Sequence, residues 1–104
     1  MILIRLALFD RGEWNHNNHY HQFLIKQLPS NCHTLLDIGC GVGEFSQLLA
    51  KYADEVVAID LSPKSIAIAE QRSTGLTNID FQVADISQWQ FPQAHFDAIA
   101  LQYI

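Results

Sequence analysis

The sequence predicts an α/β fold in which helices alternate with the strands of a parallel sheet. Short apolar segments recur along the chain, and the first of them are separated by stretches whose apolar residues return at intervals of three and four. A turn with glycine at alternate positions, Gly39 to Gly43, joins one apolar segment to the next helical stretch. Strands that alternate with helices in this way pair in parallel through right-handed crossovers.

Length and composition indicate one small globular domain. The chain has 104 residues, of which 49% are hydrophobic and 16% charged, with a net charge of −5. The absence of a basic stripe argues against a nucleic-acid partner. We read residues 1–13 as an apolar lead-in, too short for a membrane span and without a signal-peptide pattern, and residues 14–104 as the domain. Cys32 and Cys40 fit no zinc or disulfide framework, which predicts free thiols in a reducing cytoplasm.

The first half of the domain reads as helix, strand, turn and helix. Apolar residues at helical spacing predict a helix over 15–28, which Pro29 ends. Residues 34–38 are apolar almost without interruption, as expected for a strand that is covered on both faces. After the glycine turn, helical spacing returns over residues 44–52.

The second half reads as strand, helix, strand, connection and strand. Residues 55–59 predict the second strand, and Ser62 caps the next helix with Pro63 at its first position. Alternation of apolar and polar residues predicts a third strand over 79–84. A connection that holds aromatic residues leads to the fourth predicted strand, residues 96–101.

Carboxylates fall at the ends of the predicted strands. Asp37 lies near the end of strand one, Asp60 follows strand two and Asp85 follows strand three. The carboxyl ends of parallel strands share one edge of the sheet, where ligands bind. Glycine lets the backbone approach such a ligand closely, and an acid one helix and one strand beyond the turn can accept hydrogen bonds from ribose hydroxyls. The sequence therefore predicts a nucleotide-type cofactor site.

The glycine spacing favours a cofactor without phosphate. The dinucleotide fingerprint has glycine at its first, third and sixth positions. Here Gly39, Gly41 and Gly43 occupy the first, third and fifth, and Glu44 stands at the sixth. No basic residue follows the turn to meet a pyrophosphate, so a nicotinamide oxidoreductase is the less favoured alternative.

The order and spacing of four successive motifs resemble those of the class I S-adenosylmethionine-dependent methyltransferases, close to the methyltransferase type 11 group. The resemblance spans residues 14–104 and rests on four segments, 36–43, 57–62, 81–86 and 96–101. It implies a Rossmann-like three-layer fold with strand order 3-2-1-4, truncated after the fourth strand. It also implies an enzyme that transfers a methyl group from S-adenosylmethionine to a small-molecule acceptor, with this chain supplying the cofactor-binding half. A non-catalytic binding or interaction module is the alternative.

The resemblance also implies roles for individual residues. Asp37 would orient the turn near the amino group of the cofactor. Asp60 would bind the ribose hydroxyls, with Leu61 against the adenine. Asp85 would accept from the adenine amino group, with Ile86 beside the ring. The complete predicted set includes the turn backbone, the end of strand four and a lead-in tyrosine: Tyr20, Asp37, Gly39, Cys40, Gly41, Gly43, Asp60, Leu61, Asp85, Ile86 and Leu101.

Other residues bear on catalysis and assembly. His16 and His19 share a helical face but His21 does not, so we predict no metal site, while a histidine general base stays an open alternative. No catalytic residue is assigned. Asp97 lies at the start of the fourth predicted strand, before its apolar run, and is interpreted as structural. A sheet that ends at strand four has a bare apolar edge, which predicts a homodimer through that strand.

Overall fold

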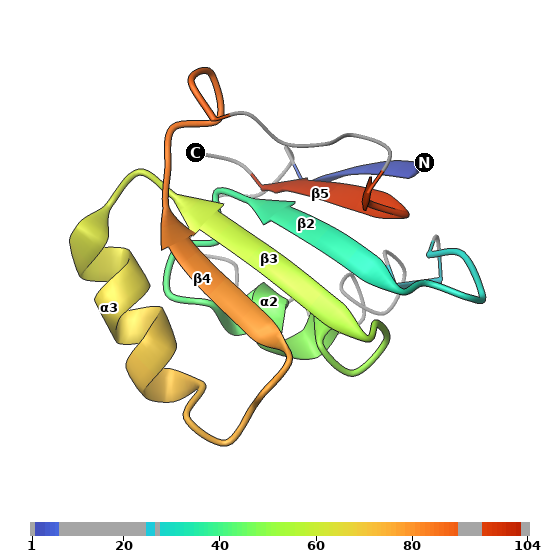
Figure 1. The fold of residues 1–104 in the computed structure, drawn as a ribbon, viewed down its shortest axis with the longest axis horizontal. Coiled ribbons are helices and arrows are strands. Elements are labelled where there is room, and N and C mark those ends of the chain that lie inside the picture. The colour runs from blue at the N-terminus through green and yellow to red at the C-terminus, as the bar shows by residue number, and fades with distance from the viewer. Residues whose placement is uncertain (1, 7–24, 27, 90–94, 103–104) are drawn as a thin grey trace.

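A computed structural model describes residues 2–6, 25–26, 28–89 and 95–102 (Figure 1). The described strands form one parallel sheet in the order β1-β5-β2-β3-β4. The strands are β1 (Ile2–Leu6), β2 (Thr34–Ile38), β3 (Glu55–Asp60), β4 (Ile79–Val83) and β5 (Ala98–Gln102), and the helices are α2 (Glu44–Leu49) and α3 (Pro63–Arg72). The run β4-β3-β2-β5 is the predicted order 3-2-1-4, which is confirmed.

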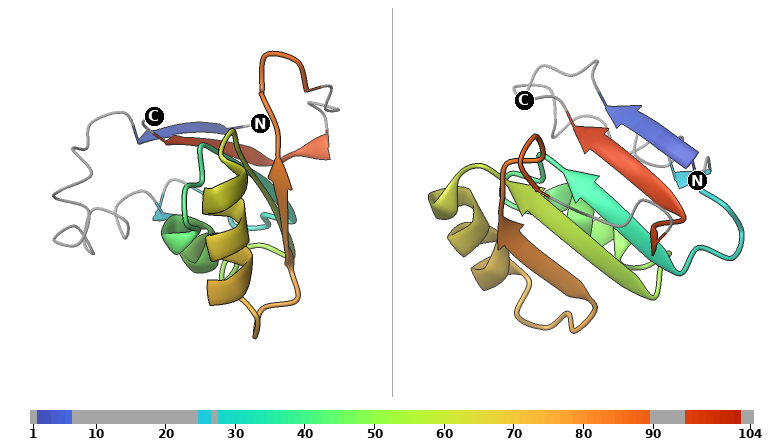
Figure 2. Two further views of the ribbon diagram at one scale, coloured as in Figure 1. Left: turned by 90° about the vertical axis from the view of Figure 1, so that its left-hand side faces the viewer. Right: turned by 45° about the horizontal axis from the view of Figure 1, so that its top comes forward.

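The strand that the sequence did not predict is β1. It pairs in parallel with β5, from Ile2 opposite Ala98 to Leu6 opposite Gln102 (Figure 2). The predicted bare edge at strand four is therefore wrong, because β5 lies between β1 and β2. The predicted homodimer through that strand loses its basis, since the backbone groups on this side of β5 already pair within the chain.

Both described helices cover one face of the sheet (Figure 2). On this face Leu35 and Val56 of the sheet pack with Phe45 and Leu49 of α2, and all four are at most 1% exposed. Full burial of one Val, Leu or Phe side chain contributes roughly 1.5–3 kcal/mol to the stability of the fold. This packing fixes α2, and with it the glycine turn that leads into the helix.

The opposite face of the sheet is also buried. Leu36, Val57, Ile59 and Ile99 form an apolar cluster there, which is covered by side chains of the connection between β4 and β5: Ala84, Ile86, Trp89 and Phe96. No helix lies on this face among the residues that the structure describes, so that part of the chain shows only one of the two helical layers that the three-layer prediction implies.

The helix starts were predicted better than the helix ends. Ser62 Oγ accepts the backbone N–H of Ser65 at 3.1 Å, and Pro63 occupies the first position of α3, as predicted. The helix predicted to reach Tyr52 ends at Leu49, because beyond Ala50 the N–H groups of Lys51 and Tyr52 bond three residues back rather than four. Most of the helix predicted over 15–28 lies outside the described residues.

Candidate cofactor site

The carboxyl ends of β2, β3 and β4 point to the same edge of the sheet (Figure 1). In the register of the sheet, Ile38 at the end of β2 lies opposite Ile59, and Asp60 at the end of β3 lies opposite Val83. The glycine turn follows β2 and the loop with Asp85 follows β4. The structure therefore places the predicted turn and Asp60 together at this edge, with Asp85 in the adjoining loop.

The glycine turn has a backbone that other residues adopt only with strain. Gly39, Gly41 and Gly43 have φ values of 76°, 58° and 88°. The N–H groups of Gly39 and Cys40 both donate to the carbonyl of Ile59, at 2.9 and 3.0 Å. The N–H of Gly43 donates to the carbonyl of Cys40 at 3.0 Å. These bonds hold the turn against the end of β3.

Two of the glycines serve different purposes. A Cβ on Gly43 would lie 3.0 Å from the Cβ of Ala69 and 3.2 Å from Phe81 Cζ, so Gly43 permits the close approach of α3 and β4. A Cβ on Gly41 would meet no atom of the described residues within 4 Å. Gly43 is therefore needed for packing, while Gly41 borders open space in which a ligand can approach the backbone.

Asp60 ties the glycine turn to the loop that starts α3. Its Oδ2 accepts the backbone N–H of Gly41 at 2.8 Å, and its Oδ1 accepts the backbone N–H of Ser62 at 2.9 Å. A carboxylate has about four acceptor sites, so both oxygens retain capacity for a further hydrogen bond. Leu61, the next residue, is 61% exposed. The two carboxylate oxygens suit the hydroxyls of a ribose, and the exposed apolar side chain of Leu61 suits the base attached to it.

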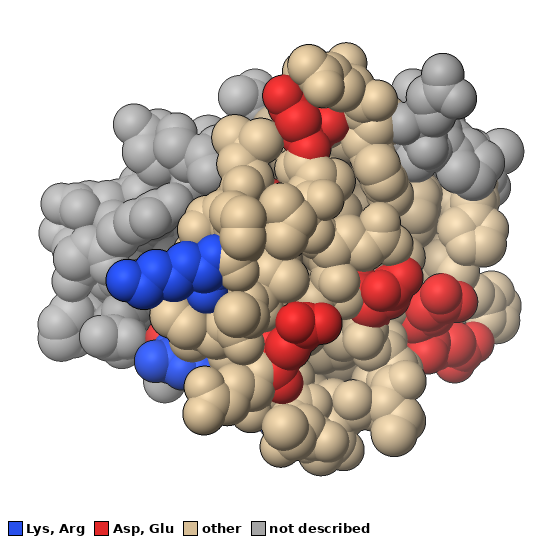
Figure 3. Space-filling view, turned by 60° about the vertical axis from the view of Figure 1, so that its left-hand side comes forward, with Lys and Arg blue, Asp and Glu red and all other residues tan. Residues whose placement is uncertain are grey.

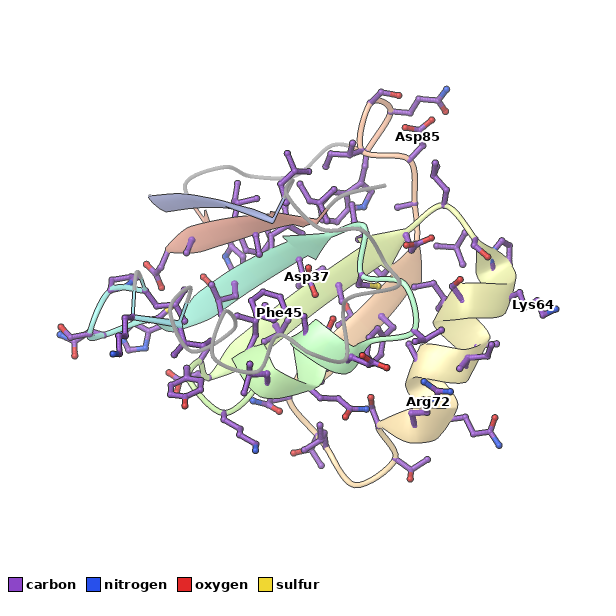
Figure 4. All side chains as sticks on the ribbon, turned by 180° about the vertical axis from the view of Figure 1, so that it is seen from behind. Asp37, Phe45, Lys64, Arg72 and Asp85 are labelled. Carbon is purple, nitrogen blue, oxygen red and sulfur yellow. The ribbon has the colours of Figure 1, made fainter. Side chains whose placement is uncertain are left out.

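Asp85 lies in a loop that extends beyond the ends of the strands (Figure 4). Its Oδ1 accepts the Ser87 hydroxyl at 2.7 Å and the Ser87 backbone N–H at 2.9 Å. These hydrogen bonds lower the pKa of Asp85 below its usual value, so the carboxylate is charged at neutral pH. The neighbouring Ile86 is half-buried and packs on the sheet face away from the helices, as does Leu101 at the end of β5.

Asp37 and Ser46 form a completely buried polar pair. Ser46 Oγ donates to Asp37 Oδ2 at 2.5 Å. Asp37 lies on β2 with Ala58 on one neighbouring strand and Ala100 on the other, and these small residues leave room beside the carboxylate. Figure 4 views Asp37 from the side of the helices. Sequence reasoning missed Ser46, although a serine among the apolar residues of a short helix was an available signal.

Cys40 contributes its backbone rather than its thiol. Its side chain is 4% exposed and packs with Ala58 and Ile66. Burial, together with the carboxylates of Asp37 and Asp60, raises the pKa of the thiol well above its usual value. The thiol therefore stays neutral and is not an activated nucleophile.

Asp97 has the structural role that its position predicted. Its Oδ2 accepts the backbone N–H groups of His33 and Thr34 at 2.7 and 3.0 Å, at the start of β2. The residue therefore lies at the edge of the sheet opposite the glycine turn. These bonds fix where the central strand begins.

Some predicted residues lie outside the described part of the chain. They are Tyr20 and the histidines His16, His19 and His21. Within the described residues, no group of three or more His, Cys, Asp and Glu side chains is placed to hold a metal ion. The described helices are also too short, or insufficiently apolar, to cross a membrane.

Comparison with known proteins identifies the family. A family model described as a methyltransferase domain matches residues 35–104. An uncharacterized methyltransferase of Mycobacterium tuberculosis is 34% identical over 86 residues, covering 83% of this chain and 43% of the relative. The chain thus spans less than half the length of this relative.

Solved structures agree with this match. The YcgJ protein of Bacillus subtilis superposes with a TM-score of 0.75 at 26% identity, covering 84% of this chain and 38% of that one. The N-methyltransferase NodS of Bradyrhizobium japonicum, in complex with S-adenosylhomocysteine, superposes with a TM-score of 0.65 at 26% identity, covering 82% and 47%. With the glycine turn and Asp60 in place at the carboxyl edge of a parallel sheet, the chain belongs to the class I methyltransferases, whose cofactor is S-adenosylmethionine.

Proposed function

We propose that this chain supplies the cofactor-binding half of an enzyme that methylates a small molecule. The observation that carries the proposal is the bond between Asp60 and the turn: the carboxylate accepts the Gly41 N–H at 2.8 Å. This bond holds the acid beside open space at Gly41, where a nucleoside can meet both groups at once. Ribose hydroxyls would then donate to the remaining acceptor sites of Asp60.

The other site residues are assigned around this anchor. In the proposal, the turn backbone from Gly39 to Gly43 contacts the methionine and ribose portions, and Leu61 covers the adenine. Asp85 accepts from the adenine amino group, which its charge and partial exposure support. The backbone of Cys40, together with Tyr20, Ile86 and Leu101, completes the set by resemblance to the family.

The residues fit the charge of the cofactor. When bound, S-adenosylmethionine supplies an electrophilic methyl group on a positively charged sulfonium. The acidic groups of the site, Asp37, Asp60 and Asp85, have the sign that attracts such a cation. The described residues that border the turn have to hold the cofactor in one orientation, because methyl transfer requires the acceptor and the methyl group to be in line. No fixed general base is needed for acceptors that react without deprotonation.

Acidic charge favours a small acceptor over RNA. Relatives include a ubiquinone biosynthesis O-methyltransferase of Xylella fastidiosa and a 23S rRNA methyltransferase of Shewanella amazonensis. A phosphate backbone requires a basic surface, whereas this chain has a net charge of −5. The face drawn in Figure 3 has few basic side chains and several acidic ones, with no continuous basic surface.

The buried free thiols of Cys32 and Cys40 support a reducing, cytoplasmic location.

Calorimetric titration tests the proposal. The chain is titrated with S-adenosylhomocysteine and with NAD, first as wild type and then as Asp60→Asn. The control is Asp80→Asn, which alters an exposed acid of β4 that bonds only to Gln82 among the described residues. We expect binding of S-adenosylhomocysteine alone. Asp60→Asn should weaken it by about tenfold or more, because hydrogen bonds to a charged acceptor are lost, and the control should leave it unchanged. Binding of NAD alone, or of neither ligand, would overturn the proposal.

A further inference from the structure

Ser46 is a buried polar residue for which the proposed function provides no role. It is 0% exposed and lies on the face of α2 that packs Phe45 and Leu49 into the core. Serine is a weaker helix former than alanine, and alanine would pack at such a position without a polar atom. Among the described residues the other buried serine is Ser73, which caps the end of α3. The reason for a hydroxyl at Ser46 is therefore to be found in its partner.

The partner is Asp37, and the bond between them closes the glycine turn from the inside. Asp37 lies two residues before Gly39, and Ser46 lies three residues after Gly43. Ser46 Oγ donates to Asp37 Oδ2 at 2.5 Å. A buried carboxylate without a donor is unstable, so the hydroxyl satisfies a group that the fold cannot expose to water.

The turn is consequently held on two sides. On the outer side, Asp60 accepts the N–H of Gly41 at 2.8 Å. On the inner side, the Ser46–Asp37 bond links the end of β2 to the first turn of α2. The distance between these two elements determines how the backbone from Gly39 to Gly43 faces a ligand.

We propose that Ser46 is a positioning residue of the cofactor site. Its hydroxyl fixes the carboxylate of Asp37 and, through it, the geometry of the Gly39–Gly43 backbone. This inference rests on the proposed function, since it assigns Ser46 to the same site. It predicts that Ser46 affects cofactor affinity through Asp37 and not through a contact of its own.

The test compares two serine variants that each lose one buried hydroxyl. Ser46→Ala removes the bond to Asp37, and Ser73→Ala removes the bond to Gln47 Nε2 at 3.0 Å. Affinity for S-adenosylhomocysteine is measured by calorimetry and referred to the folded fraction. We expect about a tenfold loss for Ser46→Ala, the factor typical of one hydrogen bond to a charged group, and less than about a twofold loss for Ser73→Ala. Equal affinities for the two variants would overturn the proposal.

A double-mutant cycle separates positioning from packing. In the background of Asp37→Asn, the effect of Ser46→Ala on affinity should fall below about twofold, because the residue acts through the carboxylate. If the two effects are additive, Ser46 does not act through Asp37 and the proposal is wrong.

Amide hydrogen exchange provides a readout that does not require ligand binding. Without ligand, Ser46→Ala should speed exchange at Gly39 and Gly43 by about tenfold relative to Val56, whose N–H bonds to Asn78 away from the turn. Unchanged relative exchange overturns the inference about Ser46. If the wild type binds no S-adenosylhomocysteine, the proposed function fails, and the exchange data still decide whether Ser46 positions the turn.

Discussion

Gly43→Ala should cost more stability than Gly41→Ala, whereas Gly41→Ala should cost more cofactor affinity. The two glycines have similar left-handed conformations, but their surroundings differ. Both have a left-handed φ, of 88° and 58°. An L-residue in this region costs roughly 1–2 kcal/mol. At Gly43 the added Cβ would also lie 3.0 Å from Ala69 and 3.2 Å from Phe81. Such overpacking costs a further ~1–3 kcal/mol.

The free energy of unfolding should therefore fall by about 2–5 kcal/mol in Gly43→Ala and by about 1–2 kcal/mol in Gly41→Ala. In a chain of this size, each kcal/mol lowers Tm by about 4–8 °C. Urea denaturation followed by circular dichroism measures both values. Equal destabilisation by the two variants would refute the packing role of Gly43.

Cofactor affinity should show the reverse order. A methyl group at Gly41 enters the open space beside the Asp60 carboxylate, where no described atom lies within 4 Å of it. We expect S-adenosylhomocysteine to bind Gly41→Ala at least about tenfold more weakly, the loss that follows when one hydrogen bond to the turn is blocked. The folded fraction of Gly43→Ala should retain more affinity than Gly41→Ala. Wild-type affinity in Gly41→Ala would contradict the placement of the ligand.

Further predictions concern other parts of the fold. Hydrogen bonds from the backbone N–H groups of Thr34 and His33 lower the pKa of Asp97. The ionised Asp97 carboxylate therefore stabilises the fold above its unfolded-state pKa, and this stabilisation is lost as the pH falls through the lower folded-state pKa. Asp97→Asn should make Tm depend less on pH in this acidic range. Cys40, buried and with a raised thiol pKa, should react with iodoacetamide only after denaturation, and rapid labelling of the native chain would show that the turn opens. Deletion of β1 should leave the apolar β5 as an edge and cause concentration-dependent association in light scattering; a monomeric deletion variant would show that β1 does not protect this edge.

Local patterns predicted the parallel sheet and the meeting of Asp60 with the glycine turn, while the strand order and the roles of the other site residues came from the family resemblance. Alternation of strands and helices predicted a parallel sheet, and the resemblance to the class I methyltransferases supplied the order of β4, β3, β2 and β5. The spacing of Asp60 from the glycine turn predicted that the two lie side by side. Asp97 could be recognised as structural because it precedes a strand, at the edge of the sheet remote from the glycine turn. The alternation of elements and the positions of Asp60 and Asp97 depend on spacing along the chain, which a single sequence displays directly.

The features that the sequence did not predict depend on contacts between distant segments. An apolar run as short as β1 has no periodicity that distinguishes a strand from another buried segment, and its partner β5 is far along the chain. Ser46 has meaning only through Asp37, across the turn. The packing role of Gly43 depends on Ala69 and Phe81, which come from other elements.

The most direct test of the cofactor site is a titration of the isotopically labelled chain with S-adenosylhomocysteine, followed by amide chemical shifts. The largest shifts should fall on the glycine turn, on Asp60 and Leu61, and on the loop of Asp85. The amides of His33 and Thr34, at the opposite edge of the sheet, should shift little. Shifts centred on that opposite edge, or no shifts at saturating ligand, would contradict the assignment of this edge as the cofactor site.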